Sequence, residues 1–164
     1  MIKEILIILA LIYLISPAMG QTDSINVDNE YREMAELETT GIATGVHIGN
    51  FPMVELGYFR HLTFEFPMTF GESYTIESYF INDFVFAPKV NFWMNFLFIN
   101  AGLSVPWYFD LHGDHSLKIR PEIGFGYKNF KINYSANISI YNRDMENVGK
   151  HFLSLNYYIR LKEK

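Results

Sequence analysis

Apolar and polar residues alternate one by one along much of this chain. In the stretch 128–142, KNFKINYSANISIYN, the even positions from Phe130 to Ile140 are apolar, and Lys, Asn and Ser fill the odd positions between them. Because successive side chains of a β-strand point to opposite faces, this pattern predicts a strand with one apolar and one polar face. The alternation alone does not decide whether the apolar face packs in a protein core or contacts lipid.

Eight segments of this kind follow one another, separated by turn residues, which is typical of an all-β sandwich or barrel. The predicted strands cover about 41–49, 53–62, 73–81, 84–93, 96–108, 116–126 and 128–142, and a last strand follows a loop at 142–149. Pro88 and Pro121 fall inside two of these strands. Because proline lacks an N–H, we expect bulges or shifted boundaries there.

The polar faces are poor in the Lys and Glu that usually cover a soluble protein. They carry mainly Gly, Ser, Asn and Tyr, with a few charges that balance in sign. The charges near strand centres are Glu55, Glu77, Glu122, Lys89, Arg120 and Arg160. Small residues and paired charges suit the interior of a narrow eight-stranded barrel, where opposite charges must pair because an isolated buried ion is costly. These six residues are therefore predicted to form a charge network inside a barrel. A narrow gated pore is the functional alternative, and Arg160, near the end of its strand, is the one residue for which a position at the rim is the alternative.

The apolar faces favour a membrane location for this barrel. Tyr and Trp lie near many predicted strand ends, as interfacial girdle residues do, and the strand lengths match a tilted transmembrane strand. The aromatic residues concerned are Tyr58, Tyr74, Trp93, Trp107, Tyr108, Tyr127, Tyr141 and Tyr157. Together the patterns predict a closed, eight-stranded, antiparallel up-and-down transmembrane β-barrel. A β-sandwich and a soluble barrel are the alternatives.

The first twenty residues, MIKEILIILALIYLISPAMG, have the layout of a cleavable signal peptide. Lys3 supplies the positive charge, residues 5–15 form the apolar core, and Ala18 and Gly20 are the small residues before the cleavage site. An uncleaved anchor helix is the alternative, but eleven apolar residues are short for a bilayer, which needs about 20. We expect a flexible polar segment over 21–40 and the barrel over 41–162.

Composition excludes several classes of function. The formal net charge is −5, so the chain has no basic surface for nucleic acid. It has no cysteine, which excludes disulfides, thiolate metal sites and cysteine nucleophiles. Phosphate-binding loops and hydrolase or metalloprotease motifs are also missing from the sequence. We therefore expect no cofactor.

Several motifs resemble those of a known group of proteins. The signal peptide, the alternating strands and the final LSLNYYIRLK resemble small outer-membrane barrels of the OmpA/OmpX type. NFPMVELGY, FVFAPKVNFWM and IRPEIGFGYKNFKINYSANI further resemble small barrels of Gram-negative bacteria of the Bacteroidetes type. The resemblance covers about 41–162 and carries no catalytic motif. The chain departs from the pattern by ending in KEK after its last strand and by a long connection at 63–72.

The resemblance implies a monomer in the outer membrane of a Gram-negative bacterium, where its partners are outer-membrane lipid and the barrel assembly machinery. The resemblance brings no assigned activity with it. The alternating segments and the lack of a membrane-spanning apolar run after residue 20 lead us to expect a structural, adhesive or protective role without catalysis. One alternative is a secreted soluble barrel that binds an apolar ligand. The other is a lipid-modifying enzyme, for which the candidate groups are His112, Asp114, His115 and Ser116, or His151 with Ser154. His112 and His115 also have the spacing of metal ligands, but a third ligand is not evident nearby, and no metal site is expected.

Overall fold

A computed structural model describes residues 37–64, 67–80, 84–142 and 148–164. The predicted signal peptide and most of the predicted polar segment therefore lie outside the described residues. The described part folds into strands β1 (Leu37–Ile48), β2 (Met53–Thr63), β3 (Met68–Phe80), β4 (Phe84–Phe96), β5 (Ile99–Asp110), β6 (His115–Tyr127), β7 (Phe130–Ala136), β8 (Ile138–Tyr141) and β9 (His151–Glu163). None of these residues forms a helix long and apolar enough to cross a bilayer.

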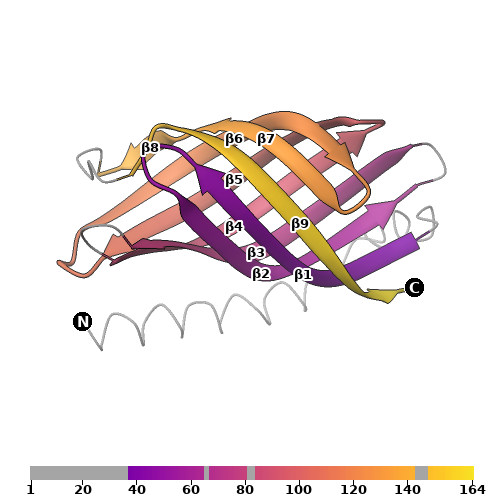
Figure 1. The fold of residues 1–164 in the computed structure, drawn as a ribbon, viewed down its shortest axis with the longest axis horizontal. Coiled ribbons are helices and arrows are strands. Elements are labelled where there is room, and N and C mark those ends of the chain that lie inside the picture. Colours follow the sequence, from indigo (N-terminus) through magenta and orange to yellow (C-terminus); the bar gives the residue numbers. More distant parts are fainter. Residues whose placement is uncertain (1–36, 65–66, 81–83, 143–147) are drawn as a thin grey trace, which may run out of the picture. The chain divides into compact units, whose positions relative to one another are not determined.

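The strands close into a barrel. β1 to β6 pair with one another in chain order, and every pairing is antiparallel. β7 and β8 both pair with β6 and together occupy one position in the wall. β9 pairs with β7 on one side and with β1 on the other, which closes the sheet (Figure 1). The fold is thus a closed, eight-stranded, antiparallel up-and-down barrel.

The strands of the barrel are strongly staggered. Paired residues can be followed around the whole wall from Glu38 in β1 through each strand in turn, and this path returns to β1 at Ile48, ten residues farther along. A stagger of this kind tilts the strands by about 40° from the barrel axis. Rows of paired residues therefore climb away from the end of the barrel where β1 begins and β9 ends, which we call the terminus end.

Both ends of the barrel domain extend beyond the predicted 41–162. β1 begins at Leu37, and β9 ends at Glu163. The sequence around Thr39 and Thr40 has no apolar alternation, so these residues were predicted to precede the barrel. They are held in the sheet by pairing with β2 on one side and with β9 on the other.

The predicted long connection at 63–72 is in fact short. β2 ends at Thr63 and β3 begins at Met68, so residues 68–72 belong to a strand. Gly71 and Glu72 break the apolar alternation there. The backbone continues as a strand because it pairs with β2 and β4 along this stretch.

The turn between β4 and β5 lies at Leu97 and Phe98 instead of the predicted Met94–Asn95. Leu97 adopts a positive φ of 54°, which a side chain tolerates only in a tight turn. The shift explains why Phe96 and Phe98 did not fit the polar face of the predicted strand 96–108. Phe96 precedes the turn, Phe98 is part of it, and both side chains are exposed.

The prolines do not cause the expected bulges. The β3–β4 register runs without a shift past Pro88, and the β5–β6 register runs without a shift past Pro121. Pro121 instead interrupts the next pairing. The β6–β7 ladder stops at Glu122, and the β6–β8 ladder resumes at Ile119. The break between β7 and β8 therefore lies opposite Pro121, which has no N–H to donate. Asn137 lies at this break.

The two faces of the wall are inverted relative to a soluble protein. Among the described residues, twenty polar or charged side chains are buried, against eleven hydrophobic ones and Pro106. Large apolar side chains instead cover the outside; Ile123 and Phe125, for example, are 61% and 70% exposed. Two residues predicted for the aromatic girdle, Trp93 and Tyr108, point inward and are buried. The face, and not the nearness to a strand end, decides which aromatic residues lie outside.

Candidate functional site

Five of the six predicted charges point into the barrel. Glu55 extends from β2, Glu77 from β3, Lys89 from β4, and Arg120 and Glu122 from β6. Each sits at an inward position of its strand, and each is less than 8% exposed. Their position follows from strand alternation, because the neighbouring residues on each strand turn outward.

Glu77 lies at the centre of the network. It accepts two hydrogen bonds from Arg120, at 2.6 Å from Nη1 and 2.9 Å from Nη2, and a third at 2.8 Å from Lys89 Nζ. The Tyr108 hydroxyl donates a further bond at 3.3 Å and also contacts Arg120 Nη2. Arg120 Nε donates to Asn137 Oδ1 at 2.9 Å. A buried carboxylate and a buried guanidinium thereby satisfy each other with two parallel hydrogen bonds.

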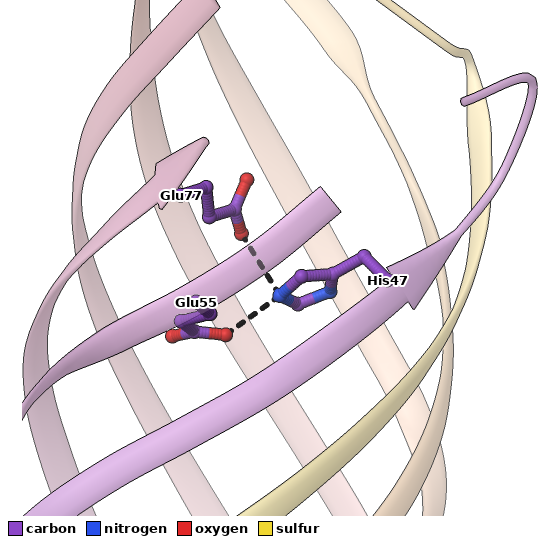
Figure 2. Close-up of side chains that lie close together, drawn as sticks. All are labelled: His47, Glu55 and Glu77. Carbon is purple, nitrogen blue, oxygen red and sulfur yellow. Dashed lines mark hydrogen bonds and ion pairs between the residues drawn. The ribbon is translucent and has the colours of Figure 1, made fainter. Parts of the chain in front are cut away.

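Glu55 forms the second centre. Its Oε1 lies 2.9 Å from Lys89 Nζ, so one lysine bridges both carboxylates. Its Oε2 lies 2.6 Å from His47 Nε2 and accepts a bond of 3.0 Å from Asn156. Figure 2 shows His47 pointing toward both Glu55 and Glu77, and its Nε2 lies 3.3 Å from Glu77 Oε1. The other ring nitrogen lies 2.6 Å from Ser154 Oγ.

His47 was not predicted to belong to the network, although its place on the polar face of the first strand was visible in the sequence. The sequence does not show the register, that is, which residues of neighbouring strands are paired. His47 pairs with Met53 in β2 and Ser154 in β9, which places its ring beside Glu55.

His47, Glu55 and Glu77 bring three metal-ligand atoms within 4.8 Å of one another. One imidazole and two carboxylates could bind a divalent ion. The same carboxylates, however, hold Lys89 at 2.8 and 2.9 Å, and Glu77 also holds Arg120. A metal ion would have to displace an ammonium group that already neutralises both acids. The cluster therefore fits a structural ion-pair network better than a metal centre.

Glu122 stands at the edge of this network. It accepts hydrogen bonds from Ser104 Oγ at 2.9 Å and from Asn133 Nδ2 at 3.3 Å. Among the described residues, hydroxyl and amide groups, in place of a directly bound cation, stabilise its carboxylate.

Arg160, the sixth predicted residue, is not part of the network. Its side chain is 37% exposed at the terminus end, where it donates to Asn129 Oδ1 at 2.6 Å and pairs with Glu163 at 2.9 Å. Arg160 occupies an inward-facing position of β9. The alternation of the two faces, however, does not show how far a residue lies from the end of the barrel.

Lys131 is a further buried cation, outside the predicted set of charges. Among the described residues, its ammonium contacts two aromatic rings and a hydroxyl: it lies 2.9 Å from the centroid of the Trp93 ring and 4.4 Å from that of Tyr158, whose hydroxyl it meets at 3.3 Å. Aromatic faces attract cations, most strongly where water is excluded. The polar face of the stretch 128–142 already contained Lys131, but nothing in the sequence pointed to its aromatic neighbours.

Side chains fill the interior at three levels in the described part of the barrel. Apolar residues pack at the end opposite the termini; they are Met53, Tyr79, Val85, Ala87, Tyr108, Val148 and Phe152, with Phe51 against them. The charge network lies next. Lys131 and the rings of Phe59, Trp93 and Tyr158 pack toward the terminus end.

The residues proposed for an enzymatic site do not come together. Ser154 points inward and binds His47, whereas His151 is on the outer face and bonds to the Tyr134 hydroxyl at 2.8 Å. Ser116 is buried and donates to backbone carbonyls, whereas His115 stacks with outward aromatic rings. The predicted pairs therefore lie on opposite faces of the wall.

The loop that carries the other two candidate groups, His112 and Asp114, is organised by Asp110. One carboxylate oxygen of Asp110 accepts hydrogen bonds from the backbone N–H of both residues, each at 2.9 Å. This arrangement closes the hairpin between β5 and β6. The sequence HGDH at residues 112–115 is thus explained by the formation of this turn.

Comparison with known proteins adds little to this picture. No family model matches the chain, and no curated protein matches it. A designed protein from work titled "De novo design of transmembrane beta-barrels" shares 8% identity with it at a TM-score of 0.41, covering 74% of this chain and 95% of the design. A likeness at that level carries no argument, so the barrel assignment rests on the strand ladders. The resemblance to OmpA/OmpX-type and Bacteroidetes-type barrels stays a prediction.

Proposed function

We propose that this chain is an integral protein of the outer membrane of a Gram-negative bacterium, with a structural, adhesive or protective role and no catalytic activity. The inversion of its two faces carries the proposal. Soluble monomers rarely expose an apolar patch larger than a few hundred Å², whereas large apolar side chains surround this barrel. Only helices and closed barrels satisfy every backbone hydrogen bond in lipid.

An outward aromatic band at the end opposite the termini supports a membrane position. Rings on β4, β5, β6 and β8 form a chain of contacts with centroids 4.9–6.3 Å apart. Its members are Phe84, Phe86, Phe109, Trp107, His115 and Tyr141. Aromatic belts of this kind lie at the boundary between hydrocarbon and headgroups in transmembrane barrels.

The filled interior favours a structural role over transport. A pore would need a path past the buried ion pairs and past the apolar residues that pack around Phe152. Eight strands leave little space beyond that taken by side chains. The same packing argues against the soluble alternative, because an apolar ligand would require a cavity lined by the apolar face, which here is the outside.

The assembly partners follow from the same proposal. A chain that crosses the outer membrane as a closed barrel is exported by its predicted signal peptide and inserted by the barrel assembly machinery. In the described barrel every strand but the short β8, which pairs with β6 alone, has ladder partners on both edges, so little strand edge is left to recruit a second copy, which supports a monomer.

Fractionation tests the proposal. The full chain is expressed in a Gram-negative host, and its membranes are separated and washed with alkaline carbonate. We expect the protein in the outer-membrane fraction, resistant to the wash, and migrating differently on a gel before and after boiling. Recovery in the soluble periplasm with identical mobility would contradict the proposal.

A further inference from the structure

An open groove of about 550 Å³ crosses the outer wall of β2, β3, β4 and β5. The strand registers define its shape. One bank is the row of paired outward residues Arg60, Glu72 and Phe92, and the other bank is the row Leu62, Phe70, Met94 and Ala101. The row between them is His61, Gly71, Trp93 and Gly102.

The floor of the groove is low because the middle row turns its side chains inward. Two of its members are glycines, and Gly71 has no room for a larger residue: a Cβ there would meet the Trp93 ring at 2.0 Å. The outer surface along this row is therefore mainly backbone. Phe70 and Phe92 stand above it on either side, at 42% and 53% exposure.

One end of the groove is charged. Arg60 Nε lies 3.4 Å from Glu38 Oε1, and Arg60 Nη1 lies 3.7 Å from Glu72 Oε1; all three side chains are 27–29% exposed. Charge-assisted bonds between such groups are normally about 2.7–2.9 Å. The Arg60 guanidinium is therefore held loosely between two acids and keeps the capacity to bind an oxyanion.

These charges face outward, where lipid is expected. A charged side chain on the lipid face is costly near the middle of the bilayer and tolerated near its surface. Glu38 lies at the start of β1, so the charged end is close to the terminus end. Because the rows climb away from this end, the apolar part of the groove, between Met94 and Phe92, extends toward the middle of the wall.

We propose that this groove binds one phospholipid whose headgroup carries both a phosphate and a primary ammonium, as phosphoethanolamine does. Arg60 binds the phosphate, Glu38 and Glu72 accept hydrogen bonds from the ammonium, and an acyl chain lies in the apolar part. The pairing of one guanidinium with two carboxylates matches that headgroup. An anionic headgroup without an ammonium would face both acids. The inference rests on the proposed membrane location.

The test uses the full chain purified in detergent. It is incubated with equal amounts of phosphatidylethanolamine, phosphatidylglycerol and phosphatidylcholine with identical acyl chains, and bound lipid is measured by native mass spectrometry. Arg60→Gln removes the phosphate ligand, and Ala101→Phe fills the apolar end from an exposed outward position. Arg160→Gln and Ala136→Phe are matched controls outside the groove.

We expect the protein to bind one phosphatidylethanolamine in preference to the other two lipids. The amount of bound phosphatidylethanolamine should fall by at least about fivefold in both groove variants and in neither control. Phosphatidylcholine tests the hydrogen bonds, because its quaternary ammonium cannot donate them. Equal retention of the three lipids, or equal loss in the controls, would overturn this inference while the barrel stays detergent-dependent. A protein that is soluble without detergent would instead overturn the proposed membrane location.

Discussion

Replacing Arg120 by leucine is expected to destabilise the barrel by about 2–4 kcal/mol. The change removes two charge-assisted hydrogen bonds to Glu77, worth about 1.5–3 kcal/mol each, and one bond to Asn137, worth about 1 kcal/mol. Leucine packed on the Phe152 ring, 4.8 Å from the present guanidinium, regains about 2 kcal/mol. Lys89 still neutralises Glu77, which keeps the loss moderate.

The assay is reversible unfolding in urea, with the protein in lipid vesicles and tryptophan fluorescence as the signal. Arg160→Leu is the matched control, because it removes an arginine whose ion pair is exposed, and it should cost less than about 1 kcal/mol. The double variant Arg120→Leu/Glu77→Leu should cost less than the sum of the two single variants, because each single change leaves a buried charge behind.

Two results would refute this reasoning. If Arg120→Leu unfolds at the same urea concentration as the original protein, the buried network does not contribute to stability as described. If the double variant is simply additive, Arg120 and Glu77 are not coupled, and the bidentate pair is not what holds them.

Three further predictions follow from the same geometry. Lys131→Met should be neutral or stabilising in urea unfolding, because among the described residues the buried ammonium contacts rings and a hydroxyl but no carboxylate that would offset its desolvation. Lys89→Met should instead cost about 3 kcal/mol, because it leaves two buried carboxylates with less compensation, and equal effects of the two changes would refute the distinction. Ile123→Arg, in the middle of the apolar wall, should destabilise the vesicle-inserted protein by about 2–4 kcal/mol, whereas Leu111→Arg in a loop should have little effect; similar values for both would argue against a lipid-facing wall. The purified protein should give no steady conductance in planar bilayers, and regular single-channel steps would show that the interior is open.

The alternation of residues predicted much of the fold. The alternation is visible in short stretches of sequence. It predicted the number of strands, the face of each strand that points inward, and the burial of Glu55, Glu77 and Lys89. The alternation does not locate the ends of the strands. Gly71 and Glu72 break the alternation although their backbone pairs on both sides, so the start of β3 was placed several residues too late.

The contacts of the network were beyond the sequence, because they depend on register and depth. His47 and Glu55 meet because β1 and β2 pair with a particular offset, and Lys131 meets Trp93 and Tyr158 from strands that are far apart in the chain. Arg160 shows the same limit: it has the inward parity but lies near the end of the barrel. No local pattern carries the offsets that decide these cases.

The central claim is that the apolar face of each strand contacts lipid. The chain has no cysteine, so single cysteines can be placed at the consecutive β7 positions 132, 133, 134 and 135, labelled with a fluorophore, and exposed to nitroxide-bearing lipid in vesicles. We expect strong quenching at Ile132 and Tyr134 and weak quenching at Asn133 and Ser135, which are buried in the barrel. Absent quenching at all four positions, or the opposite alternation, would contradict the account.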